Sequence, residues 1–205
     1  MTHSLDPKYD IEHDWVQNLL AAWELVKRTA QAPELHFNPA DRRLIVEIGI
    51  YEGASTVWFS DTLLEHPDSR LISIDPFTGS PEQINDPQNH PTLAQIEYTA
   101  RSNVARYKYP GKVRIEKGCS WDLYPHLQTE FTQGIDILYI DGAHDSTSVM
   151  RDIALYGPHV KPGGAILFDD YGADSVRVSV DAAVSTFLPV SKGVLCGWQL
   201  WTVKQ

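Results

Sequence analysis

The sequence predicts an α/β fold with a doubly wound, mostly parallel seven-stranded sheet and helices on both faces. Short apolar runs alternate with amphipathic segments along the chain, which is typical of parallel strands joined by crossover helices. The runs are almost continuously apolar, as strands buried on both faces should be. The length of 205 residues suits one domain better than two.

The elements follow from local patterns. Apolar residues at helical spacing predict a first helix over 14–30, followed by a connection over 32–43, so residues 1–40 are expected to precede the core at 44–205. Five central strands are expected at 44–49, 70–75, 113–118, 135–141 and 165–169. The tail at 190–203 is expected to add two strands around Gly197.

Helices are expected between these strands, at 55–65, 92–107, 121–131, 147–156 and 174–187. Pro125 is a candidate break in the third of them, and Asp174 is a candidate N-cap of the last. Pro162-Gly163-Gly164 is expected to form a turn. The segment 76–91 holds four prolines and is longer than ordinary connections. It follows the second strand, where ligands bind in open sheets, so it is a candidate lid loop.

Composition narrows the class of protein. The chain has 17 Lys+Arg against 27 Asp+Glu and a formal net charge of −10, so nucleic acid and anionic membranes are poor partners. The two cysteines are far apart and form no zinc motif. Residues 1–10 lack the apolar core of a signal peptide, and no apolar run reaches the ~18 residues of a membrane span. A cytoplasmic protein is expected, and a homo-oligomer is left open.

The first motif joins the first strand to its helix. The strand ends in Glu47 and enters a turn that carries Gly49, Tyr51, Gly53 and Ser55. Glycine permits unusual backbone angles and close approach of a ligand, and a helix N-terminus attracts anionic groups. Tyr51 replaces the middle glycine of the dinucleotide fingerprint, so a cofactor without a pyrophosphate fits better. A tight turn without a ligand is the alternative.

Acidic residues end three other strands. Asp75 closes the second and is suited to ribose hydroxyls. Asp141 closes the fourth, and Asp169 and Asp170 close the fifth. If those two strands are neighbours, the three carboxylates meet and repel one another unless a cation lies between them, and oxygen ligands suit Mg²⁺. Alternatively, Asp141 and Asp170 cap the following helices and Asp169 is buried in hydrogen bonds.

Two further groups stand beside these strand ends. His144, three residues beyond Asp141, is placed to accept a proton from a hydroxyl near a bound cation; a polar surface group is the alternative. Ser120 and Trp121 follow the third strand, where a hydroxyl and an indole can meet the edge and face of an adenine. The alternative for Ser120 is a helix cap.

Together these segments resemble class I S-adenosylmethionine-dependent methyltransferases. They are most similar to the metal-dependent O-methyltransferases of the catechol and caffeoyl-CoA type and to macrocin-type enzymes that methylate natural-product sugars. The resemblance extends from about 44 to 174 and rests on EIGIYEGAS at 47–55, GCSWD at 118–122, YIDGAH at 139–144 and PGGAILFDDY at 162–171. It implies a Rossmann-like fold and a single methyltransferase domain over 1–205.

The resemblance also implies roles for residues. Those that it places against S-adenosylmethionine are Glu47, Gly49, Tyr51, Gly53, Ser55, Asp75, Ser120 and Trp121. Those that it places on a divalent metal, Mg²⁺, are Asp141, Asp169 and Asp170. His144, with Asp141, is the candidate catalytic residue; catechol-type enzymes carry a lysine at the histidine position, and some natural-product relatives use histidine or aspartate as the base.

The leading hypothesis is therefore a methyltransferase that acts on a hydroxyl of a small molecule, such as a catechol, a sugar or another natural product. Tyr171, Trp198 and Trp201 are candidates for the acceptor pocket, although core packing is favoured for the two tryptophans. One alternative is a metal-independent methyltransferase with His144 as its base. A nicotinamide-dependent reductase is disfavoured because no Tyr-x-x-x-Lys pair occurs, and a non-catalytic cofactor-binding module is the last alternative.

Overall fold

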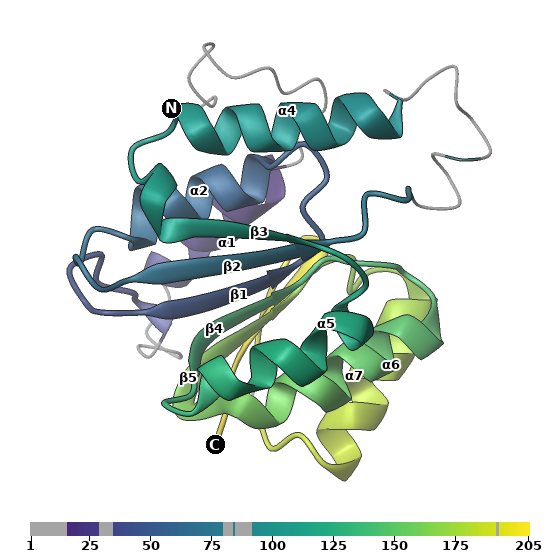
Figure 1. Ribbon diagram of the computed structural model, residues 1–205. Helices are drawn as coiled ribbons and strands as arrows, with labels where there is room; N and C mark the ends of the chain where they lie inside the picture. The colour runs from purple at the N-terminus through teal and green to yellow at the C-terminus, as the bar shows by residue number, and fades with distance from the viewer. Residues whose placement is uncertain (1–15, 29–34, 80–83, 85–91, 192) are drawn as a thin grey trace.

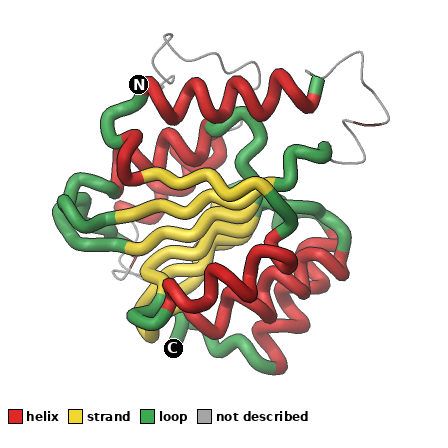
Figure 2. The backbone as a smooth tube through the Cα atoms, in the orientation of Figure 1, coloured by secondary structure: helices red, strands yellow, loops and turns green. Residues whose placement is uncertain are grey.

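A twisted sheet lies between two layers of helices in the computed structural model, which describes residues 16–28, 35–79, 84, 92–191 and 193–205 (Figures 1 and 2). Within this part of the chain the sheet has seven strands in the order β3-β2-β1-β4-β5-β7-β6. They are β1 (Leu44–Ile48), β2 (Arg70–Asp75), β3 (Val113–Lys117), β4 (Ile135–Ile140), β5 (Val160–Phe168), β6 (Val194–Cys196) and β7 (Gln199–Val203). The first five are parallel, and β7 runs antiparallel to both of its neighbours, β5 and β6. The predicted fold class is confirmed.

The helices divide between the two faces of the sheet. They are α1 (Val16–Arg28), α2 (Ala54–Leu63), α4 (Leu93–Arg106), α5 (Ser120–Leu127), α6 (Ser146–Tyr156) and α7 (Asp174–Thr186), with short 3₁₀ turns at Pro110–Lys112, Gln128–Phe131 and Gly157–His159. Figure 1 shows α1, α2 and α4 on one side and α5, α6 and α7 on the other. This division makes the sheet doubly wound, as a Rossmann-like fold requires.

The two larger of the three hydrophobic clusters in the described part of the chain lie on opposite faces of the sheet, because successive strand residues face opposite sides. Ile45 and Ile137 pack in the core beneath α1 and α2, whereas Val46 and Leu138 pack in the core beneath α5, α6 and α7. The central strands are buried on both faces, and this explains their nearly continuous apolar sequences.

Three local predictions need correction. Pro162-Gly163-Gly164 forms an irregularity inside β5 rather than a turn, because Gly163 N–H donates to Lys204 O at 2.8 Å and Lys204 N–H donates to Gly164 O at 2.9 Å. These bonds keep the segment in the sheet. The N-cap of α7 is Ala173, and Asp174 begins the helix and pairs with Arg177. The third predicted helix is not broken at Pro125, because α5 continues to Leu127 before it tightens into a 3₁₀ turn.

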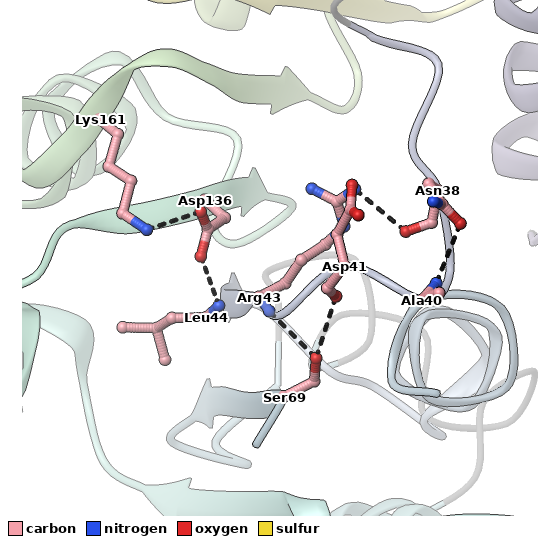
Figure 3. A network of polar contacts seen from close by, with 8 residues as sticks. All are labelled: Asn38, Ala40, Asp41, Arg43, Leu44, Ser69, Asp136 and Lys161. Atoms are coloured by element: carbon pink, nitrogen blue, oxygen red, sulfur yellow. Dashed lines mark hydrogen bonds and ion pairs between the residues drawn. The ribbon is translucent and has the colours of Figure 1, made fainter. Parts of the chain in front are cut away.

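The amino ends of the strands are joined by polar contacts (Figure 3). The Asp136 carboxylate accepts the N–H of Leu44 at 2.7 Å and the Lys161 ammonium at 2.7 Å, which links β1, β4 and β5. The Arg43 N–H donates to Ser69 Oγ at 3.0 Å, which links the entry of β1 to that of β2. The network fixes the register of the central strands at the edge opposite to the candidate site.

The strand order reverses between β1 and β4, and in open α/β sheets ligands bind at such a point, outside the carboxyl ends of the strands. The candidate lid at 76–91 falls mostly outside the described residues, which include only 76–79 and 84 of it. Residues 1–15 also lie outside them, with the start of the first predicted helix. Among the described helices, none is long and apolar enough to cross a bilayer.

Candidate active site

The carboxyl end of β1 leads into the glycine turn, residues 49–53, which begins α2. Gly49, Tyr51 and Gly53 all have positive φ angles, of 93°, 51° and 87°. Gly49 N–H donates to Ile74 O at 2.9 Å, so the turn starts within bonding distance of β2. Gly53 is the N-cap of α2 and supplies no side chain to its first turn, which leaves that turn suited to an anionic ligand group.

Asp75 holds the glycine turn in place. Its Oδ2 accepts the N–H groups of Ile50 at 2.8 Å and Tyr51 at 3.2 Å, and its Oδ1 accepts the N–H of Phe77 at 2.6 Å. The structure therefore brings the predicted ribose-binding carboxylate against the predicted methionine-binding turn. Contact of Asp75 with a ribose stays a prediction.

Glu47 is fully buried below the turn. Its carboxylate accepts three hydroxyl hydrogen bonds, from Ser55 at 2.5 Å, Thr56 at 2.7 Å and Ser73 at 2.5 Å, and so joins β1, β2 and α2. Burial raises the pKa of Glu47 to about 7, and the three hydroxyls partly offset this effect. In the structure Glu47 and Ser55 contact each other, and their contact with a cofactor stays a prediction.

We expect Glu47→Gln to flatten the pH dependence of the free energy of unfolding. The folded chain binds the Glu47 proton more tightly than the unfolded chain, because the pKa is about 7 rather than 4.5. The stabilisation is complete below pH 4.5 and is lost as the pH rises through 7, which amounts to about 3 kcal/mol. Urea unfolding of parent, Glu47→Gln and the exposed control Glu65→Gln across this range measures it. A slope in Glu47→Gln equal to that of the parent would contradict the assignment.

Acidic groups from β4 and β5 meet beside the glycine turn. One carboxylate oxygen each from Asp141 and Asp170 and one ring nitrogen of His144 lie within 4.8 Å of one another. His144 Nε2 is 2.9 Å from Asp170 Oδ2. The pKa of Asp141 lies well above its usual range, first because of desolvation and then because of the nearby carboxylates of Asp169 and Asp170. A divalent cation fits this donor set, since it would offset the repulsion.

Asp169 faces a different set of partners. Its Oδ2 accepts hydrogen bonds from the Tyr139 hydroxyl and, at 3.0 Å, from Gln199 Nε2, while its Oδ1 accepts the N–H of Asp170 at 2.8 Å. Tyr139 also contacts Asp141 Oδ2 at 3.1 Å. The predicted three-aspartate set is therefore one connected group. Asp169, however, lies in a hydrogen-bonded network with β7, and His144 takes the third place in the cluster.

The two tryptophans among the acceptor-pocket candidates lie in different environments. Trp201 is fully buried and donates from Nε1 to Gln199 Oε1 at 3.1 Å, as core packing predicts. Core packing is wrong for Trp198, which is 55% exposed in the turn between β6 and β7. Its carbonyl accepts the N–H of Tyr171 at 2.7 Å, which places it next to the end of β5. A pocket lies at the cluster, lined by Ile140, Asp141, Gly142, Ala143, His144, Val149, Phe168, Asp169 and Val176.

The turn after β3 carries the predicted adenine contacts. Gly118 N–H donates to Asp75 O at 3.1 Å, which fixes the turn beside β2. Ser120 is the first residue of α5 rather than its cap, and its hydroxyl donates to Asp152 on α6. The Arg151 guanidinium lies 4.6 Å from the Trp121 ring centroid.

Several polar residues of these networks were missed from the sequence, among them Tyr139, Asp152 and Gln199. Asp152 carried a usable signal, because it occupies the apolar face of a helix between Val149 and Tyr156. Gln199 carried none, since its contact with Asp169 depends on the pairing of β5 with β7. Tyr139 also carried no signal, because a tyrosine within a buried strand is ordinary.

Comparison with known proteins agrees with this geometry. Residues 46–171, more than half of the chain, match a family described as "Methyltransferase domain". An uncharacterized protein, R132 of Acanthamoeba polyphaga mimivirus, is 35% identical over 129 residues, which are 62% of this chain and 50% of that protein. The 8-demethyl-8-(2,3-dimethoxy-alpha-L-rhamnosyl)-tetracenomycin-C 4'-O-methyltransferase of Streptomyces olivaceus is 27% identical over 150 residues, 66% of this chain and 56% of that enzyme. The matches span about half the length of these curated relatives.

A solved structure supports the fold. The O-methyltransferase NovP is similar with a TM-score of 0.66 at 18% sequence identity, over 91% of this chain and 80% of NovP. The likeness in fold extends well beyond the segment 46–171. From the matched segment, the glycine turn and the strand order, we conclude that the chain belongs to the methyltransferase-domain family.

Proposed function

We propose that this chain is an S-adenosylmethionine-dependent O-methyltransferase that acts on a hydroxyl of a small molecule and uses a divalent cation, Mg²⁺. The observation that carries the proposal is the convergence of Asp141, His144 and Asp170 at the carboxyl ends of β4 and β5, next to the glycine turn. The natural-product O-methyltransferase among the relatives favours the same class of reaction.

The residues present fit the cofactor. The uncapped first turn of α2 suits the carboxylate of a methionine moiety, Asp75 at the end of β2 suits ribose hydroxyls, and Ser120 and Trp121 suit an adenine. These three groups follow β1, β2 and β3, which are neighbours in the sheet. We infer that the cofactor extends along this edge, with its methionine end towards α2.

Chemistry at the acceptor follows from the acidic cluster. Bound S-adenosylmethionine supplies a methyl group on a sulfonium, and a bound divalent cation supplies polarisation of the acceptor oxygen. Asp141 and Asp170 are placed to hold the cation, while Asp169 positions Asp141 through Tyr139. His144 is placed to accept the hydroxyl proton, and Asp170 orients its ring by contact with Nε2. Trp198 and Tyr171 are joined by a backbone hydrogen bond next to the end of β5, and we infer that an acceptor ring would contact them there.

One observation favours a second candidate, a methyltransferase without a metal. The pair His144–Asp170, at 2.9 Å, has the arrangement of a general base that is oriented by a carboxylate. In that case position and proton transfer alone would drive the reaction, with no ion at Asp141.

A chelator distinguishes the two candidates. The full chain is incubated with S-adenosylmethionine that carries a labelled methyl group and with a panel of catechols and hydroxylated sugars. We expect transfer to at least one acceptor, loss of transfer in excess EDTA and its return when Mg²⁺ is added beyond the chelator. Activity that survives excess EDTA would exclude the metal-dependent mechanism and favour the second candidate, the methyltransferase without a metal. A chain that binds no S-adenosylhomocysteine would contradict both.

A further inference from the structure

Residues of α6 hold the turn that begins α5 by three contacts. The Ser120 hydroxyl donates to Asp152 Oδ1, and the Tyr156 hydroxyl donates to the carbonyl oxygen of Ser120 at 2.7 Å. The guanidinium of Arg151 covers one face of the Trp121 ring, 4.6 Å from its centroid. Ser120 and Trp121 therefore have defined partners within the protein alone.

This turn lies at the same edge as the proposed cofactor site. Gly118 N–H bonds to the carbonyl of Asp75, the residue proposed to hold the ribose. Asp152 also lies close to Gly142, just beyond the end of β4. A Cβ atom added at Gly142 would be 3.5 Å from Asp152 Oδ2. A base attached to a ribose at Asp75 is therefore expected to reach Ser120.

The direction of the hydrogen bond at Ser120 decides what this residue can recognise. A serine hydroxyl has one proton and two lone pairs, whereas an ionised carboxylate can only accept. Asp152 is only 2% exposed, and burial raises its pKa to about 6, so at any pH well above that value it is ionised. Ser120 must then give its single proton to Asp152, which leaves only lone pairs on Ser120 Oγ for a ligand.

We propose that Asp152 is a positioning residue that makes Ser120 an obligate hydrogen-bond acceptor, and that this pair selects a purine with a 6-amino group over one with a 6-oxo group. The inference rests on the proposed function, because it requires the adenine to lie at Ser120. The 6-amino group of adenine donates to Ser120 Oγ. The 6-oxo group of hypoxanthine would instead place its lone pairs against those of Ser120 Oγ.

Binding of two ligands tests this proposal without catalysis. Calorimetry compares S-adenosylhomocysteine with S-inosylhomocysteine, its 6-oxo analogue, on the full chain. We expect the parent to bind the amino ligand about 10- to 100-fold more tightly. In Asp152→Ala the Ser120 hydroxyl is free to rotate and to donate, so the 6-oxo ligand should bind more tightly than it binds the parent. General damage to the site does not increase an affinity.

Tyr156→Phe is the matched control. It removes the bond to the Ser120 carbonyl from the next turn of α6 but leaves the Ser120–Asp152 bond intact. Affinity for both ligands should fall together, with their ratio unchanged. Ser120→Ala, which removes the acceptor oxygen, should also reduce the ratio of the two affinities, amino ligand over oxo ligand. It is the test variant if Asp152→Ala does not fold.

Three results would overturn the inference. Equal affinity of the parent for the two ligands would overturn it without any variant. A ratio unchanged from the parent in Asp152→Ala, or in Ser120→Ala, would show that the pair does not set the preference. A parent that binds neither ligand would overturn the proposed function itself, and the inference with it.

Discussion

Replacing Gly49 with alanine is expected to abolish binding of S-adenosylhomocysteine and to destabilise the fold. A Cβ atom at this position would lie 1.8 Å from the carbonyl oxygen of Asp141 and 2.5 Å from its carbonyl carbon. Both are backbone atoms at the end of β4, so no side chain can rotate away. The positive φ of 93° adds strain for any residue with a side chain. Together these effects are expected to cost about 3 kcal/mol or more.

The loss of binding follows from the backbone movement that the added Cβ atom requires. Relief of the contact would separate the glycine turn from the residue that follows β4, and these are the two segments proposed to hold cofactor and cation. Calorimetry with S-adenosylhomocysteine and urea unfolding measure the two effects.

Gly163→Ala is the matched control for this prediction. Gly163 also has a positive φ, of 79°, but nothing lies within 4 Å of an added Cβ atom. We expect it to cost about 1 kcal/mol from backbone strain alone and to leave cofactor binding intact. If Gly49→Ala behaved like Gly163→Ala, close packing between the turn and β4 would not explain the glycine at 49.

The fold could be predicted from the sequence because its central strands are buried on both faces. Continuous apolar runs, such as the one at β1, and their alternation with helices are local signals. The local predictions that were wrong concern segments whose structure depends on residues far away in the sequence. The segment Pro162-Gly163-Gly164 has the composition of a turn, but hydrogen bonds with Lys204, some forty residues along the chain, keep it within β5. The turn propensity of a short segment contains no information about a contact with so distant a residue.

The candidate site divides in the same way. Asp141, Asp169 and Asp170 were predicted to meet because parallel strands end at one edge, with His144 beside them, and in the structure Asp141, Asp170 and His144 form the close cluster. The orientation of Asp169 was not predictable, since it depends on Tyr139 and on Gln199 from the antiparallel β7. Trp198 and Trp201 are only three residues apart, yet one is exposed and the other is buried. Their positions in the hairpin of β6 and β7, rather than their shared apolar character, decide this difference.

Asp141→Asn is expected to lower metal-stimulated methyl transfer by about 100- to 1000-fold, the range for loss of one electrostatic group at a reacting centre. Affinity for S-adenosylhomocysteine should remain nearly unchanged, because the proposed contacts of that ligand lie on β1, β2 and β3. The substituted amide keeps one oxygen for the Tyr139 hydroxyl, while it removes the negative charge and replaces the other carboxylate oxygen with an NH2 group. The exposed Asp61→Asn, which makes the same change of charge on α2, is the control. Mg²⁺ stimulation equal to that of the parent would contradict the metal site.

Stability measured with and without Mg²⁺ separates a binding role of Asp141 from a structural one. Without metal, Asp141→Asn should raise the melting temperature, since it removes one of three carboxylates that repel one another, a repulsion that contributes to the raised pKa of Asp141. With Mg²⁺ at about 100 times its dissociation constant, the parent should gain about 2.7 kcal/mol, and the variant should gain little. The order of the two proteins should therefore reverse when the ion is added. If Asp141 only supported the fold, the variant would be the less stable protein under both conditions.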